Sequence, residues 1–179
     1  MTLPTPRVRP SRAQDIEVIF RIYADEVKNG TASFEVTPPG RDELAQRRTT
    51  LCHLGYPYLV AEIQDCIAGY GYVGQYRPRP AYRYTVENSV YIARWARRRG
   101  VGSALLNALI EQCEDRGFRQ MIAVIGNSEH VASIRLHERA GFRMVGTLEN
   151  VGFKHGRWLD TVLMQRPLDP GGSVAPSED

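Results

Sequence analysis

The sequence predicts one domain of the mixed α/β (α+β) class. Apolar strand-like runs alternate with helix-like runs between residues 85 and 142, and this order requires βαβ units with at least partly parallel pairing. An earlier run over 56–76 has the pattern of an antiparallel hairpin. The 179 residues are enough to enclose one substantial core. We therefore expect a single domain over 1–168, followed by a flexible tail over 169–179.

The first half of the chain is expected to place two helices before that hairpin. Ile16, Ile19 and Tyr23 recur at helical spacing and mark a buried helix face. Ser11 precedes this helix and is its expected N-cap. The elements expected up to residue 76 are a strand near Val8, a helix ending at Asn29-Gly30, a loop over 31–40, a polar helix over 41–55 that Gly55 ends, and a hairpin turn near Gln64-Asp65.

The second half is expected to alternate strands and helices before a terminal hairpin. Val101, Leu105 and Leu109 share one face of a helix over 100–116, which is typical of an amphipathic helix packed on a core. Gly141 is the expected stop of a shorter helix. The other elements expected are a strand over 86–94, a buried strand over 119–126, that shorter helix within 130–142, and a long hairpin over 143–168.

Composition narrows the function classes. Hydrophobic residues make up 42% of the chain and charged residues 24%, which is ordinary for a globular protein. The net charge of +3 is smaller than a general nucleic-acid binder carries, and no apolar run approaches the ~18 residues of a membrane span. The start has no apolar segment of a secretion signal, and Cys52, Cys66 and Cys113 are scattered. We expect a cytoplasmic protein with reduced thiols that binds neither nucleic acid nor membrane.

The densest positive charge lies where the helix over 100–116 begins. Amides in the first turn of a helix have no intrahelical acceptor, and the helix dipole is positive at that end. Glycines let these amides approach an anion closely, and arginines add neutralising charge. The pattern therefore predicts an anion site, with a solvated charge run as the alternative; GxGxxG and GxxxxGK[ST] motifs are absent. The residues expected around the anion are Arg97, Arg98, Arg99, Gly100, Val101, Gly102 and Ser103.

Arg97-x-x-Gly100-x-Gly102 resembles the R/Q-x-x-G-x-G/A motif with which GNAT acetyltransferases bind the pyrophosphate of acetyl-CoA. The resemblance covers about 31–166 and is closest to the phosphinothricin and methionine sulfoximine acetyltransferase branch. It implies a mixed, largely antiparallel central sheet with parallel middle strands, flanked by helices, acetyl-CoA as co-substrate, and a homodimer. The stretches that carry it include TASFE (31–35), TVENSVYI (85–92), SIRLHERAGF (133–142) and GFKHGRWLD (152–160).

The implied reaction is attack of an amine on a thioester, which needs a base and a proton for the departing thiolate. The resemblance implies that Glu87 is the base, because TVE carries the catalytic glutamate of the family; a solvent-facing strand carboxylate is the alternative. His137 stands where many GNAT enzymes have a proton-donating tyrosine, and a histidine bonded into the core is its alternative. HERAG does not match HExxH, so no metal is expected.

The same resemblance implies which residues form the two walls of a groove for acetyl-CoA. Val90, Tyr91 and Ile92 are expected to offer backbone groups to the pantetheine arm, one amide stabilising the oxyanion. The opposite wall reads IGNSEHVAS where the family commonly has I-G-D-S-x-N-x-x-S, so His130 replaces an asparagine while Ser133 is kept. Histidine caps helices poorly, and we expect a weaker or altered cofactor contact at His130.

The expected acceptor is a small anionic α-amino acid of the phosphinothricin, methionine sulfoximine or methionine sulfone type. Arginine side chains recognise carboxylate and phosphinate oxygens in two-point fashion; a solvated basic loop is the alternative for Arg77 and Arg79, and a surface lysine for Lys154. The residues that the resemblance implies around the acceptor are Phe34, Arg77, Arg79, Tyr82, Glu87, Gly126 and Lys154.

Two rival functions remain open. The same scaffold can acetylate protein N-termini or lysines, although the arginine-rich loop disfavours a peptide groove. A non-catalytic acetyl-CoA sensor is the second rival. The loss of the residues in the Glu87 and His137 positions would be typical of a sensor, and both are present.

Overall fold

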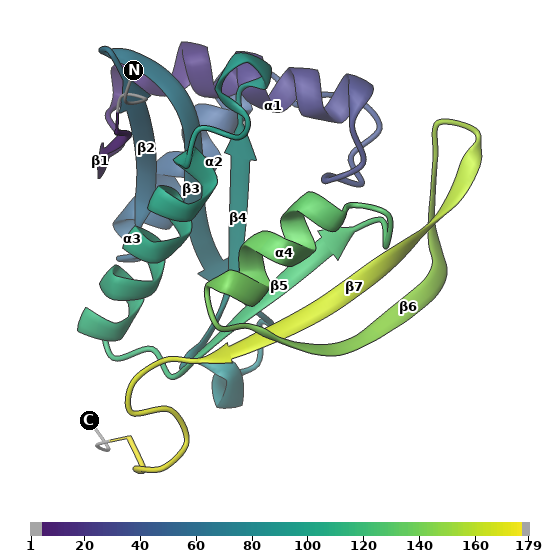
Figure 1. Cartoon of the computed structure of the whole chain (residues 1–179). Helices are drawn as coiled ribbons and strands as arrows, with labels where there is room; N and C mark the ends of the chain where they lie inside the picture. Colours follow the sequence, from purple (N-terminus) through teal and green to yellow (C-terminus); the bar gives the residue numbers. More distant parts are fainter. Residues whose placement is uncertain (1–4, 177–179) are drawn as a thin grey trace.

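The structure is a computed structural model that describes residues 5–176. One seven-stranded sheet in the order β1-β2-β3-β4-β5-β7-β6 separates two helical layers. Helices α1 and α2 lie on one face of the sheet, and α3 and α4 on the other (Figure 1). In chain order the elements are β1 (Arg7–Pro10), η1 (Ala13–Asp15), α1 (Ile16–Asn29), α2 (Arg41–His53), β2 (Tyr58–Ile63), β3 (Cys66–Gln75), η2 (Pro80–Tyr82), β4 (Thr85–Ile92), η3 (Arg94–Ala96), α3 (Val101–Asp115), β5 (Gln120–Gly126), α4 (Val131–Arg139), β6 (Arg143–Lys154) and β7 (Arg157–Pro167).

The expected mixed sheet with helices on both faces is confirmed, as is the order of its elements. The β2–β3 hairpin turns at Gln64 and Asp65, whose φ values of 50° and 62° suit a tight hairpin turn. The expected cap at Ser11 is wrong. Asp15 accepts the Arg12 N–H at 2.7 Å, while the Ser11 hydroxyl accepts from Arg48 Nε at 2.8 Å. The side chain of Asp15, three residues after Arg12, therefore caps this helix start.

Each face of the sheet has its own apolar cluster. The cluster under α3 contains Leu105, Leu106 and Leu109, all 0% exposed. The cluster under α1 contains Ile19 and Val27, which are also 0% exposed. Because alternate residues of β4 point to opposite faces, this strand contributes side chains to both clusters.

The central strands β4 and β5 form the parallel pair that the strand–helix order predicts. They pair at only four positions, from Thr85↔Gln120 to Asn88↔Ala123. Beyond these positions β4 stays paired with β3 as far as Ile92, and β5 stays paired with β7 as far as Gly126. The two strands therefore diverge at their carboxyl ends and leave an opening in the middle of the sheet.

The first residues after β7 still pack against the domain. Leu168 is 0% exposed, and the Asp169 N–H donates to Glu114 Oε1 at 3.3 Å. Residues 177–179 of the expected tail lie outside the described residues, so the flexibility of 169–179 and the domain limit at 168 stay predictions. Over the described part of the chain, no helix has the length and apolarity that crossing a membrane requires.

Candidate active site

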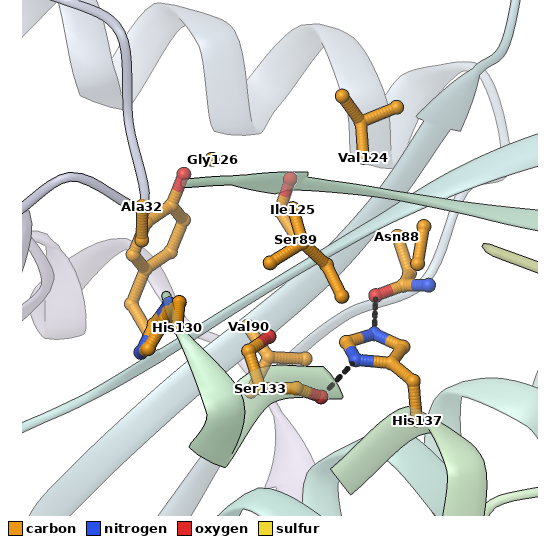
Figure 2. A pocket seen from close by; sticks show the side chains of 12 residues that line it. Ala32, Asn88, Ser89, Val90, Val124, Ile125, Gly126, His130, Ser133 and His137 are labelled. Carbon is orange, nitrogen blue, oxygen red and sulfur yellow. Dashed lines mark hydrogen bonds between the residues drawn. The ribbon is translucent and has the colours of Figure 1, made fainter. Parts of the chain in front are cut away.

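The opening between β4 and β5 contains a small cavity of about 50 Å³ (Figure 2). Its two strand walls expose backbone groups that no longer pair with each other. Helix α4 closes one side, and Ala32, from the loop after α1, closes another. The residues that line it are Ala32, Asn88, Ser89, Val90, Tyr91, Ala123, Val124, Ile125, Gly126, His130, Ser133 and His137.

The arginine–glycine turn follows β4 and leads into α3. Gly100 has φ +78°, and Ala104 donates the first helical backbone bond, to the Gly100 carbonyl at 3.0 Å. The amides of Val101, Gly102 and Ser103 therefore point out of the helix start without intrahelical acceptors. A Cβ on Gly102 would lie 3.2 Å from the Leu136 side chain of α4, so a glycine lets the two helices approach without a close contact. This geometry fits a pyrophosphate.

Glu26 of α1 connects this turn to the loop that covers the opening. Its Oε2 pairs with Arg97 at 3.4 Å, and its Oε1 accepts the Ala32 N–H at 3.0 Å. The Glu26 side chain is only 15% exposed. One carboxylate therefore holds an arginine of the anion site and the backbone of a residue that lines the opening. Arg99 lies instead over the Trp95 ring, 5.8 Å from its centroid.

Glu87 lies near the start of β4, one residue before the last paired position. It faces the α1–α2 side of the sheet, opposite Gly74 of β3. Burial raises the pKa of its carboxyl above the usual value of 4.5. A carboxylate of raised pKa is a stronger proton acceptor, which suits a general base.

His137 points from α4 toward β4 on the opposite face, and both of its ring nitrogens face an oxygen acceptor (Figure 2). Its Nδ1 lies 2.8 Å from the Ser133 carbonyl, which can only accept, so Nδ1 carries a proton. Its Nε2 lies 3.0 Å from Asn88 Oδ1, which is also an acceptor because the Asn88 Nδ2 donates to the Ile122 carbonyl. Both contacts are hydrogen bonds only when the ring carries two protons, and a neutral ring can donate to one of them. Burial lowers the His137 pKa, which favours the neutral ring. The ring must break its bond to Asn88 before it can exchange a proton with a ligand.

His130 occupies the position where the family has asparagine. It begins α4 without a side-chain cap bond, as expected for histidine. Its Nδ1 is buried and has no hydrogen-bond partner among the described residues. Burial lowers its pKa, so the ring is neutral at pH 7 and can accept or donate one hydrogen bond to a ligand in the opening.

Phe34, Gly126 and Lys154 meet at one end of the opening. A Cβ on Gly126 would lie 2.9 Å from the Phe34 ring, so the glycine makes room for the phenyl group. Lys154 is 3% exposed, and its Nζ donates to the Ser33 carbonyl at 2.7 Å. The surface alternative for Lys154 is therefore wrong. Its ammonium fixes the Thr31–Glu35 loop, and burial lowers its pKa.

Comparisons with known proteins agree with this geometry. Residues 8–163 match the family model described as an acetyltransferase (GNAT) domain. The chain belongs to the GNAT acetyltransferase family. It is 50% identical to phosphinothricin N-acetyltransferase of Alcaligenes faecalis, over 94% of this chain and 86% of that protein. It is 42% identical to L-methionine sulfoximine/L-methionine sulfone acetyltransferase of Pseudomonas aeruginosa, over 93% and 97%.

A solved structure gives the same result. The phosphinothricin acetyltransferase of Sinorhizobium meliloti, in complex with acetyl-CoA, superimposes with a TM-score of 0.95 at 46% identity. The match covers 97% of this chain and 94% of that one. The chain is thus an N-acetyltransferase of the GNAT family, and both the fold and the enzyme class predicted from the sequence are confirmed.

The remaining predicted acceptor residues of this GNAT domain lie elsewhere. Arg77, Arg79 and Tyr82 belong to the loop that joins the end of β3 to the start of β4. Phe34 and Gly126 lie farther along the opening: Gln120 is opposite the start of β4, and Gly126 is six residues, or ~20 Å, farther along β5. The structure therefore brings Phe34, Gly126 and Lys154 together, and it separates them from the arginine loop.

Sequence reasoning missed two residues of this site. Asn88, 6% exposed, positions the His137 ring, and Glu26 links the anion turn to the covering loop. Strand alternation could have indicated Asn88, because a buried amide next to Glu87 must face the other side of the sheet. Nothing in the local sequence distinguishes Glu26 from other polar residues of α1.

Proposed function

We propose that this protein transfers the acetyl group of acetyl-CoA to the α-amino group of a small amino-acid-like acceptor, with Glu87 as the base. The observation that carries the proposal is the opening between β4 and β5. It runs from the anion-binding turn toward the strand position of a buried carboxylate whose pKa is raised. The 50% and 42% identities to acetyltransferases of phosphinothricin and of methionine sulfoximine or sulfone support the acceptor class.

The chain's own residues have distinct roles in this proposal. Bound acetyl-CoA supplies a thioester-activated acetyl group. The Gly100–Ser103 amides and Arg97–Arg99 hold its pyrophosphate, and the unpaired backbone of Val90–Ile92, with His130 and Ser133, holds its pantetheine arm. Glu87 takes the proton of the attacking amine. His137 is the proposed donor to the departing thiolate, once its ring has released Asn88.

The acceptor is proposed to be anionic or strongly polar. Arg77 and Arg79 are exposed at the start of β4, close in sequence to Glu87, where they can meet a phosphinate or carboxylate. Tyr82 lies edge-to-face on Tyr76, 5.6 Å between ring centroids, which gives this loop a fixed aromatic base. Phe34 and Gly126 lie farther along the opening and bound it at that end.

A thiol-release assay with acetyl-CoA tests the proposal. The acceptor panel is phosphinothricin, methionine sulfone, methionine sulfoximine, the proteinogenic amino acids and a peptide with a free N-terminus. Turnover on the first three supports the proposed function. Turnover on the peptide alone would favour a protein acetyltransferase, and tight acetyl-CoA binding without any turnover would favour a sensor.

We propose a cytoplasmic homodimer without a resident metal. The β6–β7 hairpin supports the dimer, because several of its apolar side chains are about half exposed or more. In Figure 1 this hairpin extends beyond the rest of the sheet. A second copy covering these side chains would remove apolar surface from water. Light scattering on the purified protein measures the mass directly. The side chains concerned are Met144, Val145, Leu148, Val151, Phe153 and Trp158.

A further inference from the structure

A second cavity, about 430 Å³ in volume, lies between α2 and the sheet. This volume falls in the range of about 300–1,000 Å³ that small-molecule sites occupy. No motif in the sequence predicts it. We call it the tyrosine cavity; its walls are Tyr23, Leu44, Leu51, Tyr58, Tyr70 and Tyr72.

The composition of α2 explains why this space stays unfilled. Leu44 is the only residue of α2 that is buried. Leu51 is the next apolar side chain that reaches the cavity, and the rest of the helix is mostly polar or charged. A helix with so narrow an apolar stripe cannot fill the surface of the sheet beneath it.

Two tyrosine hydroxyls in the cavity have no protein partner. Tyr70 is 1% exposed and Tyr58 is 6% exposed. The Tyr23 hydroxyl bonds Ser33 at 2.9 Å, whereas no hydrogen bond within the described residues engages the hydroxyl of Tyr58 or Tyr70. Burial raises the pKa of both phenols, so both keep their protons. Neither hydroxyl oxygen is among the fully buried atoms that lack a partner, so both face the open space of the cavity and are available to a ligand there.

The tyrosine rings form a flat apolar wall. Tyr58 stacks on Tyr72 with ring centroids 5.0 Å apart and planes 13° apart. Tyr58 also stacks on Tyr70, at 5.9 Å and 8°. Stacked rings of this kind give the cavity an aromatic wall against which another aromatic ring can pack.

The cavity adjoins the proposed base. Tyr72 pairs with Ser89 of β4, and the next residue on the same face, Gly74, pairs with Glu87. Leu51 of the cavity wall lies 3.5 Å from where a Gly74 Cβ would be. Leu51 therefore covers the face of Gly74, and Tyr72 is the cavity residue that lies diagonally opposite Glu87 across the β3–β4 pair, on the same face of the sheet.

The charges at the rim disfavour an acidic ligand. Arg47 pairs with both Glu35, at 2.6 Å, and Glu43. Arg47 and Glu43 are the charged residues of the lining, and because two carboxylates already engage Arg47, it offers no free cation to an acidic side chain. A neutral side chain fits this surrounding better than a carboxylate or phosphinate does.

We propose that the tyrosine cavity receives the side chain of an aromatic α-amino acid whose amino group is acetylated beside Glu87. The inference rests on the proposed function and extends its acceptor class. In the reaction the amide C–N bond forms as the thioester C–S bond breaks. The neutral amine gives one proton to Glu87, and the departing thiolate takes one proton to become the thiol of CoA.

The test compares L-tryptophan and L-tyrosine with methionine sulfone as acceptors in the thiol-release assay. Thr50 is exposed and lines the cavity, so Thr50→Phe should fill its mouth, whereas Thr49→Phe changes the adjacent residue, which does not line it. We expect turnover on the aromatic acceptors by the wild type. Thr50→Phe should lower the ratio of kcat/KM for tryptophan to that for methionine sulfone at least tenfold, and Thr49→Phe should leave it unchanged.

Tyr70→Phe adds a readout that a purely structural hydroxyl would not give. Removing a hydroxyl that makes no hydrogen bond within the described residues should not lower the melting temperature, but it should raise KM for tryptophan or tyrosine. Turnover on methionine sulfone with none on either aromatic acceptor overturns the inference and leaves the proposed function standing. Absence of turnover on every acceptor overturns the proposed function. Calorimetric titration with tryptophan then tests whether the tyrosine cavity binds an aromatic amino acid. Binding that Thr50→Phe removes supports the inference, and absence of binding overturns it.

Discussion

The β4–β5 opening and the tyrosine cavity lie on either side of one strand, and they are built differently. The opening is made by backbone: two strands stop pairing, and a glycine turn presents its amides. The cavity is made by side chains from α1, α2, β2 and β3 that are far apart in the sequence. A backbone-built site comes from contiguous segments and leaves a readable motif. A side-chain-built cavity becomes visible only when the elements have been packed.

The largest effect is expected at Glu87, which lies on β4 between the two regions. Glu87→Gln removes the base and should lower kcat about 10²–10⁴-fold for methionine sulfone and for tryptophan alike. Burial raises the Glu87 pKa, and the carboxylate is the active form. Wild-type kcat/KM should therefore rise with pH through a pKa above 4.5, and the variant should lack that limb. The pH–rate profile of each acceptor measures this.

The matched control for Glu87 is Glu111→Gln, an exposed carboxylate on α3. It should leave both profiles as they are. An acid limb that survives in Glu87→Gln would remove Glu87 as the base. If Glu87→Gln lost activity on only one acceptor class, Glu87 would not be the base for both acceptors.

Gly102→Val separates the two regions, because it changes the opening alone. The glycine has only 3.2 Å between its Cβ position and Leu136, so a branched side chain must displace α4 or the turn. We expect the KM for acetyl-CoA to rise at least tenfold, while tryptophan binding by calorimetry stays within twofold. Gly40→Ala is the control, since Gly40 also precedes a helix and has open space around it. An unchanged KM for acetyl-CoA would place the cofactor elsewhere.

The same difference between features built from contiguous backbone and features built from distant side chains decides how much the sequence could predict. The apolar periodicity of Val101, Leu105 and Leu109 and the turn at Gln64-Asp65 predicted elements that the structure contains. The anion turn was predictable because its glycines and arginines are consecutive. Glu26 and Asn88 were not, since each acts through a partner at least 49 residues away in the chain. The Arg77 loop and Phe34 were predicted from resemblance to surround one acceptor, and the register of β4 and β5 shows how far apart along the strands the two lie.

A smaller effect is expected at Asn88, on the wall of the opening. Asn88→Ala leaves the buried Nε2 of His137 without its partner, which should lower the free energy of unfolding by about 1–3 kcal/mol. Urea unfolding measures this. Ser89→Ala, at the next position on the opposite face, should cost less. An Asn88→Ala variant as stable as the wild type would mean that the His137 ring finds another partner and is free to move in the opening.

The smallest effect, at Glu26, has an unusual sign. Glu26→Gln keeps an oxygen for the Ala32 N–H but removes the charge that holds Arg97 at 3.4 Å. The pair competes with a bound pyrophosphate for Arg97, so its loss should tighten CoA binding about twofold to fivefold, as suits an ion pair whose arginine is exposed to solvent. Calorimetry at low and high salt measures the gain, which should shrink as salt screens the charges.

The control for Glu26 is its neighbour Asp25, whose carboxylate pairs with Arg94 at 2.6 Å, outside the turn. Asp25→Asn should leave CoA affinity nearly unchanged. Glu26→Ala removes the Ala32 bond as well and should raise the KM for methionine sulfone, because the covering loop is then held less firmly. If Glu26→Gln weakens CoA binding instead, the carboxylate serves chiefly to order the turn. The opening would then depend, like the tyrosine cavity, on side chains distant in sequence.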